Sequence, residues 1–139
     1  MNVLVDTNIL LDVLARREPF YADSARVWTL AETGQVAGFA SALSLPNLFY
    51  LVRRTKGPKA ARKGISILRD IFTLVPLDVQ IASQAIDADI KDFEDAIQFF
   101  SALRCGATTL ITRNPKDFPS GDVAIQPPAE FLATHFAER

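Results

Sequence analysis

Three carboxylates fall within four residues in the stretch DFEDAIQFF, Asp92 to Phe100, directly before an apolar run. Carboxylates can cap the start of a helix, because they accept hydrogen bonds from its free backbone N–H groups and favour its dipole. They can also hold a cation, and ligand sets made only of oxygen suit Mg²⁺ or Mn²⁺ rather than zinc. The stretch therefore leaves open a structural role and a metal-binding role for these acids.

Helical periodicity separates the acids of this stretch. With about 100° between successive residues, Asp95 lies at the edge of the face formed by the apolar residues that follow, and Asp92 projects into the same sector. Glu94 projects away from that face, towards Gln98 and Ser101, and is predicted to be solvated. Capping accounts for Asp92, whereas an unpaired charge at Asp95 beside a core is unfavourable unless a cation compensates it.

Two further polar groups follow predicted strands. Asp6 comes directly after an apolar segment, where it either caps the next helix or contributes to a site at the sheet edge. Thr112, Asn114 and Asp117 follow a second buried strand, although turn chemistry alone would account for Asn114 and Asp117. Each group by itself is therefore ambiguous.

Taken together, these residues predict a metal site at one end of a sheet. The three acids expected to hold the metal and to act in catalysis are Asp6, Asp95 and Asp117. Their expected polar neighbours are Asn8, Thr112 and Asn114. The only histidine, His135, is predicted to lie on the surface, and the chain has neither a Gly-rich phosphate loop nor a GxSxG elbow.

The overall composition is that of an ordinary globular chain. Its 139 residues fit one domain, 1–139, with 49% apolar and 22% charged residues. No apolar stretch approaches about 18 residues and the N-terminus does not resemble a signal peptide, so neither a membrane span nor export is expected. Cys105 is the only cysteine, which excludes an intramolecular disulfide and a Cys-based zinc site and predicts a cytoplasmic location.

The net charge of −1 hides two opposite clusters. Residues 53–69 carry basic side chains and no acid, whereas residues 78–95 carry six acids against Lys91 alone. The basic residues predicted to contact an RNA backbone are Arg53, Arg54, Lys56, Lys59, Arg62 and Lys63. Such contacts would be salt-dependent, but solvated helix faces or contact with an acidic partner would also account for the cluster.

Strand-like and helix-like segments alternate along the chain. The predicted strands are 2–5, 36–42, 71–77, 109–112 and 123–126. The predicted helices are 7–17, 21–32 (with Trp28 in the core), 45–54, 59–70, 78–88, 92–105 and 128–136. This alternation predicts an α/β fold, a three-layer α/β/α sandwich around a mostly parallel sheet of four to five strands. Ligands of such folds gather at the carboxyl ends of the strands, near a switch in strand order.

The segments VLVDTNILLD, SALSLPNLFYLV, DFEDAIQFFSALRCGATTLITRN and PKDF resemble the PIN-domain ribonucleases in order and spacing, over essentially the whole chain. Within that family the chain looks most similar to the VapC-like toxins. The resemblance implies a PIN-like α/β/α fold, an acidic pocket for Mg²⁺ or Mn²⁺, and hydrolysis of single-stranded or structured RNA. It also implies an antitoxin partner and commonly a homodimer.

The resemblance assigns residues to the positions of the family's motifs. Asp6 and Asp95 match its first and third acids, and Asn114, with Asp117 beside it, meets the fourth position. The residues that match its polar supports are Thr7, Asn8 and Thr112.

Asn47 departs from the pattern, because many members of the family carry Glu there. An amide oxygen brings no negative charge, so either the affinity for metal is lower or Asp92 or Glu94 compensates. The leading hypothesis is a metal-dependent endoribonuclease that acts as a toxin, and the alternative is a catalytically weak PIN-like module that binds RNA or an antitoxin. A phosphatase of the haloacid-dehalogenase type is disfavoured, because its acid/base Asp would stand where this chain has Asn8.

Overall fold

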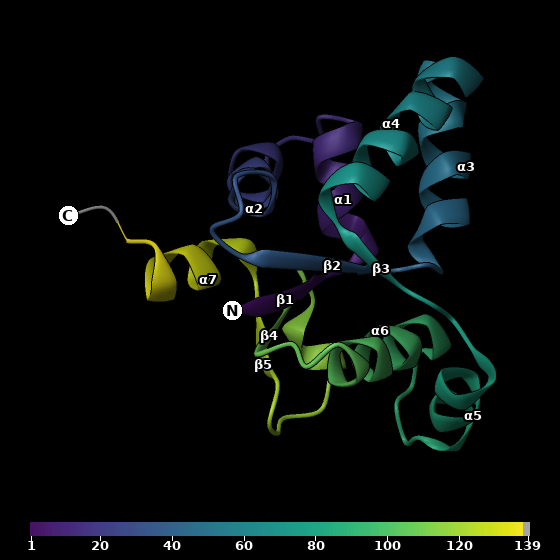
Figure 1. Cartoon of the computed structure of the whole chain (residues 1–139), viewed down its shortest axis with the longest axis vertical. Helices are drawn as coiled ribbons and strands as arrows, with labels where there is room; N and C mark the ends of the chain where they lie inside the picture. Colours follow the sequence, from purple (N-terminus) through teal and green to yellow (C-terminus); the bar gives the residue numbers. More distant parts are fainter. Residues whose placement is uncertain (138–139) are drawn as a thin grey trace.

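The computed structural model describes residues 1–137 and shows three layers (Figure 1). The central sheet has the order β3-β2-β1-β4-β5, and every neighbouring pair is parallel. Its strands are β1 (Asn2–Val5), β2 (Ala37–Ser41), β3 (Thr73–Val75), β4 (Thr109–Ile111) and β5 (Ala124–Gln126). The predicted α/β/α sandwich around a parallel sheet is therefore confirmed.

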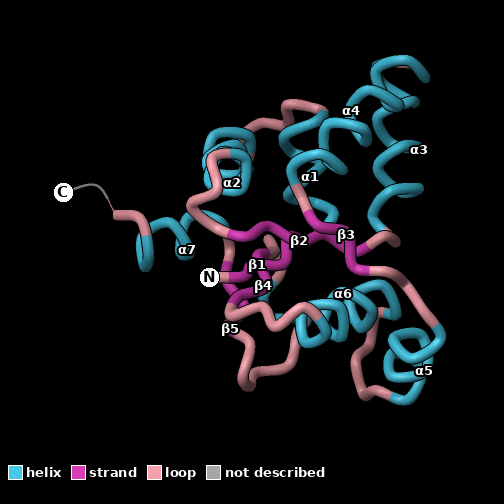
Figure 2. The backbone as a smooth tube through the Cα atoms, in the orientation of Figure 1, coloured by secondary structure: helices cyan, strands magenta, loops and turns pink. Residues whose placement is uncertain are grey.

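Helices cover both faces of the sheet (Figure 2). One face carries α1 (Thr7–Leu14), α2 (Tyr21–Glu32), α3 (Ser44–Lys56), α4 (Pro58–Ile71) and α7 (Pro128–His135). The other face carries α5 (Val79–Asp87) and α6 (Phe93–Arg104), and a short 3₁₀ helix, η1 (Pro115–Asp117), lies between β4 and β5. Among the helices of residues 1–137, none is long and apolar enough to span a membrane.

Each face of the sheet has its own hydrophobic core. Successive side chains of a strand point to opposite faces, so Val3 and Val5 enter the core beneath α1–α4, whereas Leu4 enters the core beneath α5 and α6. Burial on both faces explains why β1 reads as a continuous apolar run. Trp28 is buried as predicted and contacts Phe72 edge-on, with ring centroids 5.1 Å apart.

Most predicted elements differ from those observed by one or two residues at an end, and two predictions are three or more residues too long. The predicted strand 71–77 is shorter, because α4 continues to Ile71 and β3 pairs with β2 only as far as Val75, which lies opposite the last residue of β2, Ser41. The predicted helix 7–17 ends at Leu14, and Arg16 then adopts a left-handed conformation with φ of 50°. Neither difference moves the carboxyl ends of β1 and β4, where the site residues lie.

Helices α3 and α4 form a hairpin that extends away from the sheet (Figure 1). Gly57 joins them with φ of 87°, a value that favours glycine, and Pro58 begins α4 where no intrahelical N–H bond is required. We call the predicted RNA-contacting residues of this hairpin the basic arm: Arg53, Arg54, Lys56, Lys59, Arg62 and Lys63.

Candidate active site

Asp6 lies at the point where the strand order changes direction. After β1 the chain adds β2 and β3 on one side and then returns to place β4 on the other side of β1. Asp6 follows β1, and Thr112 follows β4 and donates from Oγ1 to Asp6 Oδ2 at 2.8 Å. The backbone N–H of Thr7 donates to Asp6 Oδ1 at 2.7 Å, so Asp6 also occupies the N-cap position of α1. Both carboxylate oxygens are thereby held in place at the topological switch.

A cavity of about 230 Å³ opens beside Asp6. It is lined by Asp6, Thr7, Asn8, Asn47, Tyr50, Leu51, Glu94, Asp95 and Gln98, from α1, α3, α6 and the end of β1. The lining thus brings together five residues predicted from the sequence and includes no lysine or arginine. Asp6 itself is almost fully buried, and this burial raises its pKa against the opposing effect of its hydrogen bonds to Thr112 and Thr7.

Asp95 is surrounded by negative charge. Burial, and then the charges of Asp92, Asp6, Asp117 and Glu94, raise the pKa of Asp95 to about 7. The four acids come from three segments: Asp92 and Glu94 from the first turn of α6, Asp6 from the end of β1 and Asp117 from η1. Each is close enough for its charge to disfavour ionisation of Asp95. A cation placed among them would remove the repulsion.

Asp92 caps α6, as predicted. Its Oδ1 accepts a hydrogen bond from the backbone N–H of Asp95 at 2.9 Å, and its side chain is exposed. This bond fixes the first turn of α6 and hence the position of Asp95 at the cavity.

The predicted orientation of α6 is correct for Ala96 and wrong for Leu103, Gln98 and Ser101. The sequence placed Ala96, Phe99, Phe100 and Leu103 on the buried face, and it placed Glu94 towards Gln98, Ser101 and solvent. In the structure Leu103 is 44% exposed, whereas the residues buried against the sheet are Ala96, Ile97, Gln98, Ser101 and Ala102. Glu94 is exposed, as predicted, but it lies one turn before the buried Gln98, and its side chain lines the cavity.

The error arises because α6 is apolar on two sides. Phe99 and Phe100 are partly buried and pack against the core on this face of the sheet, to which α5 also contributes. The polar spacing of Glu94, Gln98 and Ser101, at i, i+4 and i+7, is the sequence signal that could have identified the inward side.

A buried polar cluster that the sequence did not suggest lies beneath the cavity. Gln98 Nε2 donates to Thr7 Oγ1 and to Ser44 Oγ, each at 3.2 Å, and the two hydroxyl oxygens lie 2.7 Å apart. Gln98 thus donates one hydrogen to each of the two hydroxyl oxygens. The hydrogen bond between Thr7 and Ser44 uses only one of the two hydroxyl hydrogens, so one hydroxyl hydrogen is left over. Since Ser44 is fully buried and Thr7 lines the cavity, the remaining hydrogen is best placed on Thr7, pointing into the cavity.

Asn47 and Glu94 face each other across the cavity. Asn47 Nδ2 lies 3.4 Å from Glu94 Oε1, a long hydrogen bond between α3 and α6. The acid that the resemblance places at position 47 is therefore absent, but a carboxylate from the opposite wall reaches the same space.

The remaining predicted site residues lie around the cavity rather than in its wall. The backbone N–H of Asn114 donates to Thr112 Oγ1 at 3.2 Å, which links the turn after β4 to the residue that holds Asp6. Asn114 and Asp117 are both exposed, and Asp117 is close enough for its charge to raise the pKa of Asp95. His135 is exposed at the end of α7, as predicted.

The donor set fits a hard divalent cation. Carboxylate oxygens of Asp6, Glu94 and Asp95 and the amide of Asn47 line one cavity, and Gln98 Oε1 is buried without a hydrogen-bond partner among the described residues. Within residues 1–137 no three acids, cysteines or histidines lie close enough, as their side chains stand, to hold one ion. Small side-chain rotations at the half-buried Asp95 and exposed Glu94 would therefore accompany binding.

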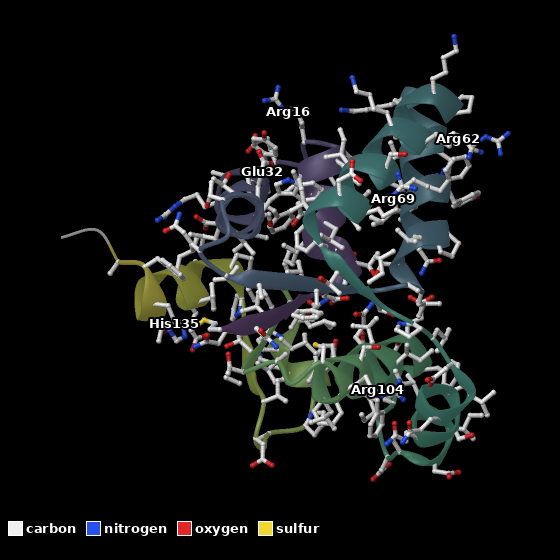
Figure 3. All side chains as sticks on the ribbon, in the orientation of Figure 1. Arg16, Glu32, Arg62, Arg69, Arg104 and His135 are labelled. Atoms are coloured by element: carbon white, nitrogen blue, oxygen red, sulfur yellow. The ribbon has the colours of Figure 1, made fainter. Side chains whose placement is uncertain are left out.

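The basic arm divides between two sides of the hairpin. Arg54 follows Asn47 by seven residues and projects within about 20° of it, whereas Arg53 projects about 120° away. The guanidinium of Arg54 lies 5.6 Å from the ring centroid of Tyr50. That of Arg62 lies 5.5 Å from the ring of Phe49, and Figure 3 shows Arg62 pointing away from the body of the molecule. The single cluster in the sequence is thus not a single surface.

We expect the metal-free protein to lose stability as the pH rises through about 7. The pKa of Asp95, about 7 in the folded chain, lies above its ordinary value of 3.8, so the folded chain binds this proton more tightly than the unfolded chain. The contribution of protonated Asp95 to the stability of the fold is complete when the pH is below the ordinary pKa of 3.8, and it is lost as the pH rises through about 7. In thermal unfolding with EDTA from about pH 5 to about pH 8, Asp95→Asn should show a smaller fall in melting temperature than the wild type. Equal falls would contradict this expectation.

Comparison with known proteins agrees with the fold. A family described as PIN domain matches residues 2–116. Among solved structures, a chain of the VapBC2 complex from Rickettsia felis is 17% identical over 91% of this chain and 98% of its own, with a TM-score of 0.68. A chain of the Salmonella typhimurium VapBC complex is 16% identical over 92% of this chain and 98% of its own, with a TM-score of 0.70.

A third similar structure is VapC20 from Mycobacterium tuberculosis, described as a toxin that cleaves the Sarcin-Ricin loop. It is 18% identical over 78% of this chain and 86% of its own, with a TM-score of 0.64. Among curated proteins, none matches the sequence. At these identities the solved structures establish a shared fold.

Proposed function

The chain belongs to the PIN-domain family, and we propose that it is a metal-dependent endoribonuclease that acts as the toxin of a type II toxin–antitoxin pair. The observation that carries this proposal is the cavity at the topological switch, where Asp6, Glu94 and Asp95 lie together without a lysine or arginine in its wall. Such a cavity repels the phosphates of RNA unless a cation neutralises it. The same acids supply the ligands that Mg²⁺ and Mn²⁺ prefer.

The residues proposed to hold Mg²⁺ or Mn²⁺ are Asp6 and Asp95, with Asp117 and Glu94 as further carboxylates. When bound, the metal would lower the pKa of a water molecule and stabilise the charge that develops on the phosphate during hydrolysis. The chain's own contribution is to hold the acids in place. Thr112 and the Thr7 N–H orient Asp6, Asp92 fixes the turn that carries Asp95, and Asn47 orients Glu94.

Thr7 is proposed to donate a hydrogen bond to the substrate. Its hydroxyl accepts from Gln98, pairs with Ser44 and lines the cavity, so its hydrogen can reach a phosphate oxygen or an attacking water. In this arrangement Gln98 and Ser44 position a donor without contacting RNA themselves.

The proposed partners follow from the family. Similar solved chains come from VapBC complexes, and one such toxin is described as cleaving RNA at the Sarcin-Ricin loop. We therefore propose an RNA substrate and a separate antitoxin protein, and a homodimer as the assembled form. The alternative, a module that binds RNA or an antitoxin without cleavage, draws its support from Asn47 in place of an acid.

The direct test is cleavage of a mixed RNA pool by the protein, freed of any partner, with Mg²⁺ or Mn²⁺ and with EDTA. Cleavage that requires the metal and is lost in Asp95→Asn supports the proposal. If the wild type binds RNA but cleaves nothing with either metal, the binding-module alternative becomes the better description.

Arg54→Ala should weaken RNA binding more than Arg53→Ala does. The two residues are adjacent, exposed and equally charged, but Arg54 projects to the cavity side of α3. Loss of one phosphate contact should reduce the slope of log affinity against log salt by about 0.7 for single-stranded RNA. Fluorescence anisotropy in EDTA at several salt concentrations measures this slope. An equal loss of RNA affinity in Arg53→Ala and Arg54→Ala would show that the basic arm as a whole attracts RNA without orienting it towards the cavity.

A further inference from the structure

Tyr50 occupies an unusual place in the candidate site. It lines the same cavity as Asp6, Asn47 and Asp95, yet 58% of its surface is exposed. It follows Asn47 by three residues on α3, so both side chains face the cavity from the same side of the helix. A large aromatic ring is therefore presented to solvent directly beside a cluster of carboxylates.

Arg54 lies one turn further along α3 and contacts the ring of Tyr50. Its guanidinium is 5.6 Å from the ring centroid of Tyr50, within the range of a cation–π contact. Arg54 is itself exposed. One side of α3 thus carries a stripe of three side chains. In order from the cavity outwards, they are the amide of Asn47, the ring of Tyr50 and the cation of Arg54.

This stripe continues into a second hollow. Leu51, which lines the acidic cavity, also lines a neighbouring cavity between α1 and α3 of about 460 Å³. The wall of that second cavity contains Arg17, Arg54 and Lys56 and no acid. Tyr50 thus lines the negative cavity and contacts Arg54, which lines the positive one. A polyanion that extends from the acidic cavity to the basic one would pass this pair.

The charge of the acidic cavity limits what can hold RNA there. Asp6, Glu94 and Asp95 line the cavity without a lysine or arginine, so in the absence of a cation they repel a phosphodiester. The negative charge of the cavity does not oppose contact with a nucleobase, because a base is uncharged. Stacking of a base on an aromatic side chain contributes about 5- to 100-fold in affinity, and cations beyond the ring can pair with the next phosphates.

We propose that Tyr50, braced by Arg54, is a stacking platform for the base of a nucleotide that flanks the scissile phosphate. This inference rests on the proposed nuclease function and deepens it. A base within a duplex is already stacked on both faces, so the platform selects an unpaired nucleotide at that position. Tyr50 acts on substrate binding and position, whereas the carboxylates act on the chemistry.

The test compares the wild type with Tyr50→Ala and Tyr50→Phe on a short single-stranded RNA that the wild type cleaves. Tyr50→Ala should raise KM about 5- to 100-fold with kcat changed less than about 2-fold, and Tyr50→Phe should remain close to the wild type, because the ring is retained. Anisotropy in EDTA should show the same ranking in affinity without cleavage. Since Tyr50 is exposed, the melting temperatures of the variants should match that of the wild type.

The decisive measurement replaces each of the two bases that flank the cleavage site by an abasic residue. At one of them the replacement should weaken binding to the wild type but not to Tyr50→Ala, since the platform is then already missing. If each abasic replacement weakens RNA binding equally in the wild type and in Tyr50→Ala, the stacking proposal is overturned, whereas the proposed nuclease function is not affected. A change in oligomeric state by light scattering, with RNA affinity unchanged, overturns it in favour of a protein contact. Failure of the wild type to bind or cleave any RNA overturns the proposed function instead.

Discussion

Replacing Asp95 by asparagine should lower the rate of RNA cleavage by at least about a thousandfold, equivalent to about 4 kcal/mol of transition-state stabilisation. The substitution keeps the size of the side chain and removes its charge from the cavity that Asp6 and Glu94 also line. A bound divalent cation would lose a charged ligand, and the stabilisation that it would give to the attacking water and the phosphate would be reduced. The fold should persist, because α6 keeps its cap at Asp92.

The measurement is single-turnover cleavage of a labelled RNA pool with Mg²⁺ or Mn²⁺. Asp87→Asn is the matched control, because Asp87 is an exposed acid at the end of α5 that does not line the cavity. A second readout is independent of activity: Mg²⁺ should raise the melting temperature of the wild type and of the control more than that of Asp95→Asn. Equal cleavage by wild type and Asp95→Asn would mean that the activity is a contaminant or that the pocket is misassigned.

Replacing Asp12 by alanine should lower the free energy of unfolding by about 3 to 5 kcal/mol. Asp12 is fully buried in α1, where Ser24 Oγ donates to its Oδ2 at 3.1 Å. Its carboxylate faces two guanidinium groups, with Arg113 Nε at 3.6 Å and Arg17 Nε at 3.9 Å. Without it, Arg113, whose side chain is only 18% exposed, would keep a charge with no counterion in the described part of the chain.

The consequence should extend to the site. Arg113 directly follows Thr112, which holds Asp6, and its guanidinium also lies 4.0 Å from the ring centroid of Phe20. An unpaired Arg113 would move towards solvent and disturb the turn that carries Thr112. We therefore expect Asp12→Ala to lose cleavage activity as well as stability, although Asp12 does not line the cavity.

Asp70→Ala provides the contrast for this prediction. Asp70 pairs with Arg69 at 3.7 Å, but the two side chains are 72% and 68% exposed. A solvated pair of this kind contributes about 0 to 1 kcal/mol, so the variant should unfold close to the wild type in urea. If Asp12→Ala and Asp70→Ala lower the free energy of unfolding by similar amounts, the buried ion pair of Asp12 stabilises the fold no more than an exposed one.

Much of the fold could be predicted because its signals are local. The buried strand β1 reads as a continuous apolar run, and β1 and α2 have the predicted bounds. The lengths of β3 and α1 could not be predicted in the same way. β3 ends where its partner β2 ends, and the pairing of Ser41 with Val75 joins residues far apart in the chain.

The sequence by itself determined which residue types stand at the carboxyl ends of β1 and β4 and at the start of α6, because capping and strand burial depend on neighbours in the chain. It thereby predicted that Asp6, Asp95 and Thr112 belong to one site, and the structure brings them to the same end of the sheet. Only the tertiary structure decided which side of α6 meets the sheet. That helix is apolar on two sides, and its orientation depends on distant partners. Phe99 and Phe100 pack in the core to which α5 contributes, whereas Thr7 and Ser44 accept hydrogen bonds from Gln98 Nε2 on the side where Glu94 lines the cavity.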